Sequence, residues 1–144
     1  MDGPVTLSFE LPFVAGQHRP RFSSRPFPHM LKPDRDAERE AEIRAAFDAA
    51  MAREGLRAPL APRGTPVAIA IHTRRPLPKS TPKRVGSAQD VGKPDADNVA
   101  KLVLDALNGH AYCDDSQVTC LRVTKHPRTR DGASTYVEVF VRGE

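Results

Sequence analysis

Apolar and polar residues alternate near the beginning of the chain. In residues 4–13, "PVTLSFELPF", apolar side chains occupy every second position from Val5 to Phe13. This period of two is typical of a β-strand with one buried face. The short apolar run "TPVAIAIHT" predicts a second strand around residues 67–71, and "SQVTCLRVTKH" and "STYVEVFVRG" predict two more toward the C-terminus.

Two other segments have the spacing of an amphipathic helix. In residues 36–53 the apolar side chains recur every three or four positions, and Asp34 or Asp36 is available to cap the first turn. In residues 97–108 the apolar residues again follow one helical face, and the Asn-Gly pair at 108–109 predicts a left-handed stop. Both segments are therefore expected to cover a sheet.

The order of these elements is β-α-β-loop-α-β-β. It predicts an α+β fold in which one mixed sheet of about four strands carries two main helices. Residues 14–33 contain four prolines and are expected to form a loop. The Asp-Gly pair in "PRTRDGA" reads as a turn, which predicts that the last two strands are antiparallel neighbours.

The length and the composition narrow the class of protein. A chain of 144 residues fits a single domain, residues 1–144. No stretch approaches the ~18 apolar residues of a membrane span, and "MDGPVTLSFE" has neither the basic start nor the apolar run of a signal peptide. We therefore expect a cytoplasmic protein without a membrane partner. Cys113 and Cys120 fit neither a disulfide framework nor a zinc site and are expected to be free thiols.

Positive charge is concentrated in one segment. The chain has a net charge of +4 and a pI of about 9.4. Residues 72–93 contain one acid, Asp90, three prolines, and six basic residues: Arg74, Arg75, Lys79, Lys83, Arg84 and Lys93. Without apolar periodicity, this segment is expected to be a flexible basic loop that contacts a polyanion.

Carboxylates surround the second predicted helix. Asp95 and Asp97 lie at its beginning, and Asp114 and Asp115 follow its end, just before the next strand. Only one of two adjacent strand residues can face a given site, so one of the latter pair is expected to join Asp95 and Asp97. Three converging carboxylates are the oxygen ligands that hold Mg²⁺ or Mn²⁺ while leaving positions open for water and phosphate.

Each of these features also has a simpler interpretation. An Asp before a helix is often an N-cap, and two Asp before a strand are often a turn. Asp97, Lys101 and Asp105 are spaced by four and would otherwise form a surface ion-pair ladder. No two of the five histidines have the spacing of metal ligands, so each is expected to be a polar surface residue. They are His18, His29, His72, His110 and His126. An acidic cluster directly after a cationic loop favours a site that accepts a phosphodiester.

Residues 92–118 contain four motifs in order. They are Lys-Pro-Asp-x-Asp-Asn, a Lys four positions after the second Asp, Leu-Asp-Ala-Leu-Asn-Gly, and Asp-Asp-x-Gln. This stretch resembles the RusA family of Holliday junction resolvases, small endonucleases often carried by phages and prophages. The resemblance extends more weakly to "GQHRPRF" at 16–22, where many members have a longer Gly-x-Pro-rich lead and an additional Lys.

The resemblance implies a Mg²⁺-dependent homodimer that makes paired nicks in a four-way DNA junction, in recombination and repair. It implies that Asp95, Asp97 and Asp115 bind the metal and that Lys101 is an essential cation. Asp114 would orient the metal-binding residues without binding the metal itself, and Asp105 would hold Lys101 in place. The expected DNA-binding residues are those of the basic loop together with Arg19 and Arg21. A two-fold dimer suits a junction with approximate two-fold symmetry, through either the helix at 36–53 or an exposed sheet edge.

The same motifs also occur in proteins with other functions. A glycosyltransferase or phosphotransferase also uses a DxD motif, but in the latter the first Asp follows an apolar strand, whereas residues 79–92 are polar and basic. A catalytically silent DNA-binding module of the same fold would keep the basic loop. The complete acidic set favours the enzyme over the silent module.

Overall fold

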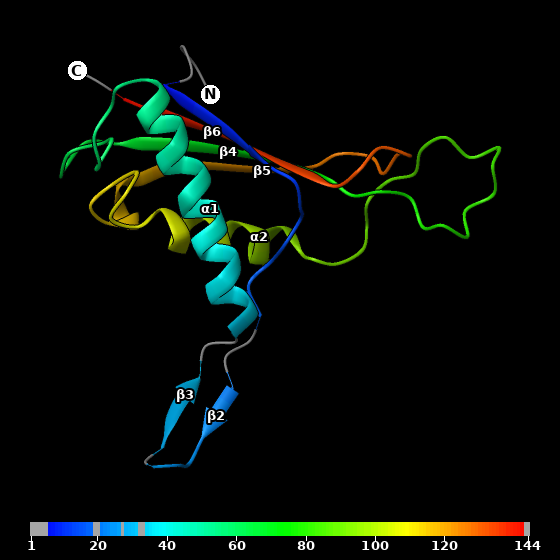
Figure 1. Cartoon of the computed structure of the whole chain (residues 1–144), viewed down its shortest axis with the longest axis horizontal. Helices are drawn as coiled ribbons and strands as arrows, with labels where there is room; N and C mark the ends of the chain where they lie inside the picture. Colours follow the sequence, from blue (N-terminus) through cyan, green and yellow to red (C-terminus); the bar gives the residue numbers. More distant parts are fainter. Residues whose placement is uncertain (1–5, 19–20, 27, 32–33, 143–144) are drawn as a thin grey trace.

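The chain folds around one mixed four-stranded sheet. A computed structural model describes residues 6–18, 21–26, 28–31 and 34–142 (Figure 1). The strands lie in the order β1-β6-β4-β5, and only the β4–β5 pair is parallel. Their bounds are β1 Leu7–Leu11, β4 Val67–Arg74, β5 Val118–Lys125 and β6 Ser134–Val141. This arrangement confirms the predicted α+β fold with a mixed sheet.

Both main helices cover the same face of the sheet (Figure 1). They are α1, Asp34–Arg53, and α2, Ala96–Leu107, and both begin and end within two residues of the predicted bounds. Their apolar stripes meet the inward residues of the strands in one core, where the ring of Phe47 on α1 stands edge-on to Phe9 on β1 at 5.9 Å. Burial of this face explains why the helical and strand periodicities were readable from the sequence.

The ends of the helices differ in part from the prediction. Gly109 adopts a φ of +84°, which confirms the left-handed stop after α2. Asp34 and Asp36 both lie inside the first turn of α1 rather than before it. Asp36 is buried, and its carboxylate accepts a hydrogen bond from the backbone N–H of His18 at 2.8 Å. The start of α1 is thus held to the chain that follows β1.

The segment 14–33 is more regular than predicted. It contains two short antiparallel strands, β2 (Arg21–Ser23) and β3 (His29–Leu31), which form a separate two-stranded sheet. The four prolines of this segment lie outside both strands, so none of them removes a hydrogen-bond donor from the ladder. The expectation of a loop was wrong for these six residues.

The prediction that the last two strands are neighbours was also wrong. β4 lies between β5 and β6, parallel to the first and antiparallel to the second. Its first five residues are all buried, as expected of a central strand with a neighbouring strand on each side. The crossover through α2 brings β5 back parallel to β4, so the connection from β5 to β6 has to pass β4.

Strand pairing also brings two histidines together. His72 on β4 lies 2.8 Å from His126 (Nδ1 to Nε2) and 3.0 Å from Glu138 on β6 (Nε2 to Oε1). Burial, and then the positive charge of Arg74, lower the pKa of His126. These residues are far apart in the sequence, which is why the histidines looked scattered.

Candidate active site

The chain that follows β1 lies directly against the beginning of α2. The backbone N–H of Gln17 donates to the carbonyl oxygen of Asn98 at 2.9 Å, and its side-chain amide donates to Asp105 at 2.6 Å. A Cβ atom on Gly16 would lie only 2.6 Å from the Cβ of Pro94. Gly16 therefore permits an approach that any larger residue would prevent, and this approach places "GQH" beside the DxD motif.

Asp95 and Asp97 present their carboxylates at the surface of this region. Asp95 occupies the N-cap position of α2, but its side chain makes no capping hydrogen bond. Both aspartates are exposed, and so is Lys101 one turn further along the helix. Asp95 thus has the position of an N-cap, but its carboxylate does not perform the capping role.

A groove of about 910 Å³ runs along these residues. Three segments line it: residues 14–18, the first turns of α1, and residues 93–101. Four cationic side chains belong to its wall, namely Arg35, Arg39, Lys93 and Lys101. A third lining acid, Asp36, is only 1% exposed. Its carboxylate oxygen Oδ1 lies 2.6 Å from Nδ1 of His18, so it already has a partner. The groove therefore offers two exposed carboxylates among four cations, an arrangement that can receive a phosphate backbone.

The second pair of aspartates lies in a short 3-10 helix, η1 (Asp115–Gln117), rather than at the first residues of a strand. Asp114 caps this turn, because its carboxylate accepts a hydrogen bond from the backbone N–H of Ser116. Hydrogen bonds from Ser116 lower the pKa of Asp114. Asp115 is exposed, and its side chain takes no part in this cap.

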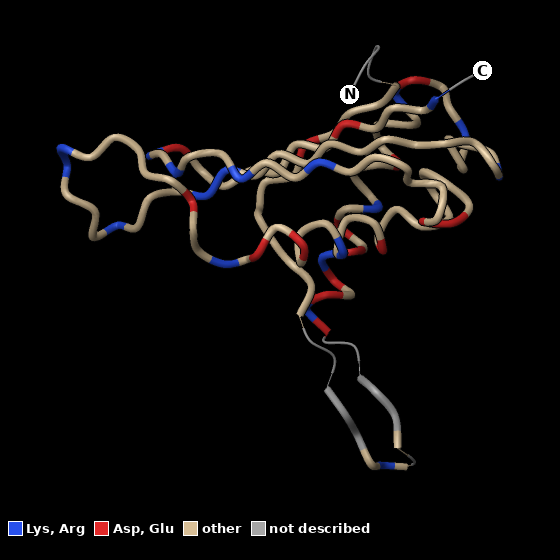
Figure 2. The backbone as a smooth tube through the Cα atoms, turned by 180° about the vertical axis from the view of Figure 1, so that it is seen from behind, with Lys and Arg blue, Asp and Glu red and all other residues tan. Residues whose placement is uncertain are grey.

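The structure places the two pairs of aspartates at opposite ends of α2. This helix has 12 residues, so it is about 18 Å long at 1.5 Å per residue. Figures 1 and 2 show that the chain turns back into β5 at the end of α2 remote from its start, with acidic positions at both ends. The hydroxyl of Tyr112, three residues before Asp115, donates to the carbonyl oxygen of Leu104 at 2.6 Å and holds this part of the chain against the second half of α2. Burial raises the pKa of Tyr112, and the negative charges of Asp115, Asp105 and Asp114 raise it further.

The predicted carboxylate set is consequently not assembled within one chain. Among the described residues, no three Asp, Glu, His or Cys side chains lie close enough to hold a metal ion. Magnesium binds oxygen at about 2.0–2.1 Å, so carboxylates at opposite ends of an 18 Å helix cannot share one ion. Asp95 and Asp97 alone remain together in the groove.

The exposed face of α2 carries the predicted stripe of charge. Asp97, Lys101 and Asp105 are all exposed, whereas the apolar residues of the other face are buried: Val99, Leu102, Val103 and Leu107. In the part of the chain that the structure describes, Lys101 forms no salt bridge with either aspartate, and Asp105 instead accepts a hydrogen bond from Gln17. The ammonium group of Lys101 is therefore available to a ligand.

The basic loop is tied to a second segment of the chain. Residues 75–92 and 126–133 lie side by side and extend beyond the sheet; we call them the basic arm (Figure 1). The N–H of Leu77 donates to Thr129 at 2.7 Å, and the N–H of Arg128 donates to Ala88 at 2.7 Å. Arg130 donates to the carbonyl oxygens of residues 82 and 85.

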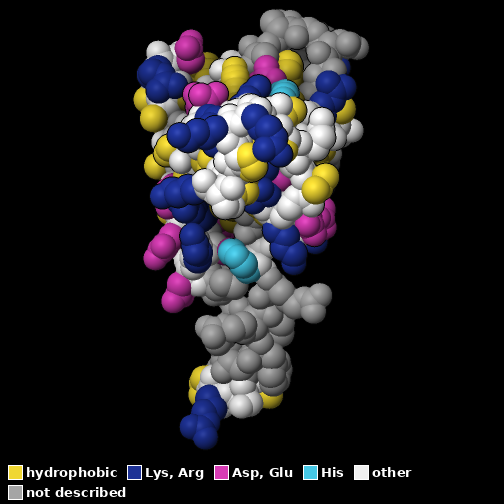
Figure 3. Space-filling view, turned by 90° about the vertical axis from the view of Figure 1, so that its right-hand side faces the viewer, with side chains coloured by type: hydrophobic (Ala, Val, Ile, Leu, Met, Phe, Trp, Pro, Cys, Tyr) yellow, Lys and Arg dark blue, Asp and Glu magenta, His cyan; other side chains and the backbone are white. Residues whose placement is uncertain are grey.

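Residues 126–133 add positive charge to the arm that was not predicted from the sequence of the basic loop. Arg128 and Arg130 join the exposed Lys79, Lys83 and Arg84 on the arm. Figure 3, which views the molecule from the end of the arm, shows several Lys and Arg side chains on this surface, among hydrophobic and uncharged groups, with acidic side chains mostly toward its margin. The arm is thus a cationic surface separate from the groove.

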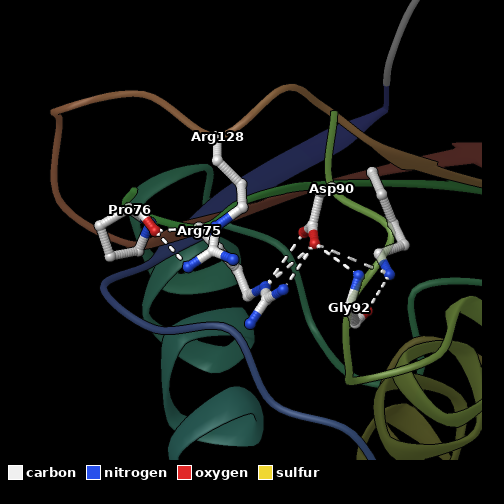
Figure 4. Close-up of polar contacts among 6 residues, drawn as sticks. Arg75, Pro76, Asp90, Gly92 and Arg128 are labelled. Carbon is white, nitrogen blue, oxygen red and sulfur yellow. Dashed lines mark hydrogen bonds and ion pairs between the residues drawn. The ribbon is translucent and has the colours of Figure 1, made fainter. Parts of the chain in front are cut away.

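A buried ion pair holds the base of the arm (Figure 4). The carboxylate of Asp90 has no exposed surface and accepts hydrogen bonds from Arg75, the shortest at 2.6 Å. The N–H of Gly92 also donates to it at 3.3 Å, while Lys125 lies 3.9 Å from it and donates to the carbonyl oxygen of Gly92. Hydrogen bonds from Arg75 hold the pKa of Asp90 below its ordinary value, although burial acts in the opposite direction.

The remaining predicted contacts have different positions. Arg75 is committed to this ion pair, whereas Arg74 is exposed at the end of β4 and Lys93 is exposed at the groove. Arg19 lies outside the described residues, and Arg21 is described only by its backbone in β2. The two cysteines, Cys113 and Cys120, are free, as predicted.

An α+β fold that combines exposed carboxylates at a helix start with a basic groove and a basic arm is typical of enzymes that act on nucleic acids. Residues 12–141 match the sequence profile of the family described as Endodeoxyribonuclease RusA, and the chain belongs to this family. It is also 41% identical over 68 residues to a protein of Bacillus subtilis (strain 168) named "Uncharacterized protein YqaN". That similarity covers 42% of this chain and 48% of the relative.

Within the described residues, neither helix combines the length and the apolar character that crossing a bilayer requires.

Proposed function

We propose that this protein is an endodeoxyribonuclease that resolves four-way DNA junctions in recombination and repair, with paired nicks that restore two duplexes. The observation that supports it most directly is the groove at the start of α2, where Asp95 and Asp97 lie among four cations. Its position on the RusA motif, in a chain that matches the family over residues 12–141, supports the same conclusion.

The residues of the groove have distinct roles in this proposal. Lys93, Arg35 and Arg39 attract and orient the sugar–phosphate backbone. Lys101, which has no acidic partner among the described residues, neutralises the charge that develops on the phosphate or on the leaving oxygen. Cutting would leave 5′-phosphate and 3′-hydroxyl ends. The basic arm binds a neighbouring part of the junction through Lys79, Lys83 and Arg84.

Mg²⁺, or Mn²⁺ in its place, is the expected cofactor. When bound, such an ion would polarise the phosphate and acidify a water molecule. One chain offers it two carboxylates, Asp95 and Asp97, where the sequence predicts three. A single chain therefore does not fit the predicted metal site.

The test compares a labelled four-way junction with a matched duplex, with and without Mg²⁺. We expect the wild-type protein to nick the junction at symmetric positions only when Mg²⁺ is present. Asp97→Asn should abolish nicking but keep or tighten junction binding in EDTA, because asparagine keeps the size of the side chain and removes a charge that repels DNA. Asp48→Asn, an exposed aspartate on α1, is the matched control.

Two results would contradict the proposal. Nicking by Asp97→Asn within a few-fold of the wild-type rate would remove Asp97 from the catalytic set. Junction binding without nicking by the wild-type protein would favour the silent DNA-binding module, which is consistent with the two-carboxylate groove of a single chain.

A further inference from the structure

Asp36 is a buried carboxylate in the wall of the groove. It lies in the first turn of α1, is 1% exposed, and contacts His18 through both of its side-chain oxygens. Oδ2 accepts a hydrogen bond from the backbone N–H of His18 at 2.8 Å, and Oδ1 lies 2.6 Å from Nδ1 of the imidazole ring. Since an ionised carboxylate can only accept hydrogen bonds, we assign the ring proton to Nδ1.

The second nitrogen of this ring, Nε2, is left free at the surface. The side chain of His18 is 62% exposed, whereas that of Asp36 is 1% exposed. Among the described residues, Nε2 of His18 has no hydrogen-bond partner. The same side chain lines the groove together with Asp95, Asp97 and Lys101. A free imidazole nitrogen therefore belongs to the same groove as the exposed carboxylates of the RusA motif.

Residues 17 and 18 hold this ring between the two helices. The backbone N–H of Gln17 donates to the carbonyl oxygen of Asn98, the residue after Asp97, at 2.9 Å. The next residue, His18, is bound to α1 through Asp36. The chain thus crosses from α2 to α1 at the imidazole, and hydrogen bonds on both sides fix the position of the ring relative to the DxD motif.

We propose that His18 is a further catalytic residue of the nuclease, which donates a proton from Nε2 to the leaving 3′-oxygen, and that Asp36 is its positioning residue. This inference rests on the proposed function, because it concerns the same hydrolysis. As the oxygen of water bonds to phosphorus, the bond from phosphorus to the 3′-oxygen breaks, and this oxygen takes the proton of the imidazolium. The attacking water releases a proton to the solvent, and another proton from the solvent restores the imidazolium. A carboxylate on the far nitrogen of a catalytic imidazole holds the ring in one orientation and stabilises its protonated form.

The other charged groups of the groove are less suited to this proton transfer. They are Arg35, Asp36, Arg39, Lys93, Asp95, Asp97 and Lys101. Ammonium and guanidinium groups bind their protons too tightly to be efficient acids near neutral pH, whereas an imidazole gains and loses a proton in this range. Carboxylates in water are ionised near neutral pH and have no proton to donate. The imidazole of His18 is thus the group of the groove that can supply the proton, while Lys101 supplies charge.

The first test changes the leaving group. His18→Ala should slow the nicking of an ordinary junction by about 100-fold, a typical contribution of general acid catalysis. In a second junction, sulfur replaces the 3′-oxygen at the nicking position, and the leaving thiolate needs no proton because a thiol is far more acidic than an alcohol. His18→Ala and the wild type should therefore cut the sulfur junction at rates within a few-fold of each other. A deficit of His18→Ala that is equally large on both junctions would overturn the proposal.

Two further variants separate proton donation from DNA binding. His18→Lys keeps a positive charge in the groove but should nick the ordinary junction as slowly as His18→Ala, since an ammonium group is a poor acid near neutral pH. Nicking by His18→Lys at close to the wild-type rate would show that only the charge matters and would overturn the proposal. His110→Ala is the matched control, because Nδ1 of His110 also lies 3.0 Å from an aspartate, Asp48, and neither residue lines the groove. The control should nick both junctions at the wild-type rate.

The second test does not depend on activity. Nitrogen NMR of the ring, at a pH at which the imidazole is neutral, should place the proton of His18 on Nδ1 in the wild-type protein. In Asp36→Asn the side-chain oxygen should keep the hydrogen bond from the backbone N–H, which can only donate, so the amide N–H would donate to Nδ1 and the ring proton should move to Nε2. Asp36→Asn should also nick more slowly by about tenfold or more, because its amide N–H faces a protonated Nδ1 unfavourably. A wild-type ring with its proton on Nε2 would overturn the proposal, because Asp36 would then not hold Nδ1.

The two tests also separate this inference from the proposed function. A wild-type protein that never nicks DNA would contradict the nuclease activity, while the NMR spectrum would still report whether Asp36 holds the ring of His18. A wild-type protein that nicks the junction, together with a His18→Ala variant that nicks the ordinary junction within a few-fold of it, would contradict the catalytic role of His18 alone.

Discussion

Asp90→Asn tests the ion pair that holds the base of the basic arm. The substitution keeps the shape of the side chain but removes the negative charge that faces Arg75 and Lys125. Both cations are largely buried, with 21% and 17% of their side chains exposed, so they would face each other without a counter-charge. Breaking a buried pair in this way costs about 3–5 kcal/mol.

We expect a loss near the lower limit, about 3 kcal/mol, because the exposed fraction of Arg75 lets water reach the guanidinium. For a chain of this size that loss corresponds to a decrease in Tm of about 6–12 °C at pH 7. Thermal unfolding followed by circular dichroism measures it. Asp131→Asn, an exposed aspartate on the same arm, is the matched control and should change the stability by no more than about 0.5 kcal/mol.

The pH dependence gives a second criterion. The pKa of Asp90 is lowered in the folded chain, so its stabilising contribution is fully present above the ordinary aspartate pKa of about 3.9. It is lost as the pH falls through the lower pKa of the folded chain and the carboxylate is protonated. The Tm difference between wild type and Asp90→Asn should therefore be constant from pH 8 to 5 and should narrow at more acidic pH. A variant that melts within 2 °C of Asp131→Asn at pH 7 would refute this account of the ion pair.

Two further predictions concern the groove and the arm. Gly16→Ala should destabilise the protein by about 1–3 kcal/mol and reduce nicking, because the new Cβ would lie 2.6 Å from the Cβ of Pro94. Thermal melts and nicking rates measure these effects. The control is Gly86→Ala, whose Cβ would meet no atom within 4 Å, and an effect of Gly16→Ala no larger than that of the control would contradict the prediction. Lys83→Ala with Arg84→Ala should lower the slope of log binding constant against log salt by about 1.8, because two phosphate contacts are lost. An unchanged slope, equal to that of the exposed pair Arg53→Ala with Arg57→Ala, would show that the arm does not contact DNA.

Local periodicity predicted the two main helices and the four strands of the main sheet. The apolar spacing in residues 97–108 predicted α2, which is observed at residues 96–107, and the spacing in residues 36–53 predicted α1. Such patterns can be recognised because one face of each helix or strand is buried, and this periodicity does not depend on which element packs against that face. The short strands β2 and β3 were missed, because their proline-rich surroundings carry no periodicity.

Neighbour relations between strands could not be predicted in the same way. The Asp-Gly turn suggested that β5 and β6 pair, but β4, whose first five residues are buried, takes the place between them. A turn signal is local, whereas the choice of a pairing partner depends on which strand gains most from having a neighbour on each side. The same pairing brings His72 to His126, and the base of the arm brings Arg75 to Asp90, at positions that no sequence spacing indicates.

The features of the candidate site also differ in whether the sequence or the tertiary structure determines them. The sequence by itself determined the charged stripe of Asp97, Lys101 and Asp105, because helical spacing alone puts residues four apart on one face. Only the tertiary structure decided that Gly16 packs on Pro94 to form the groove. It also decided that Asp115 stands at the opposite end of α2, because proximity in the sequence does not bring residues together across a rigid helix of about 18 Å.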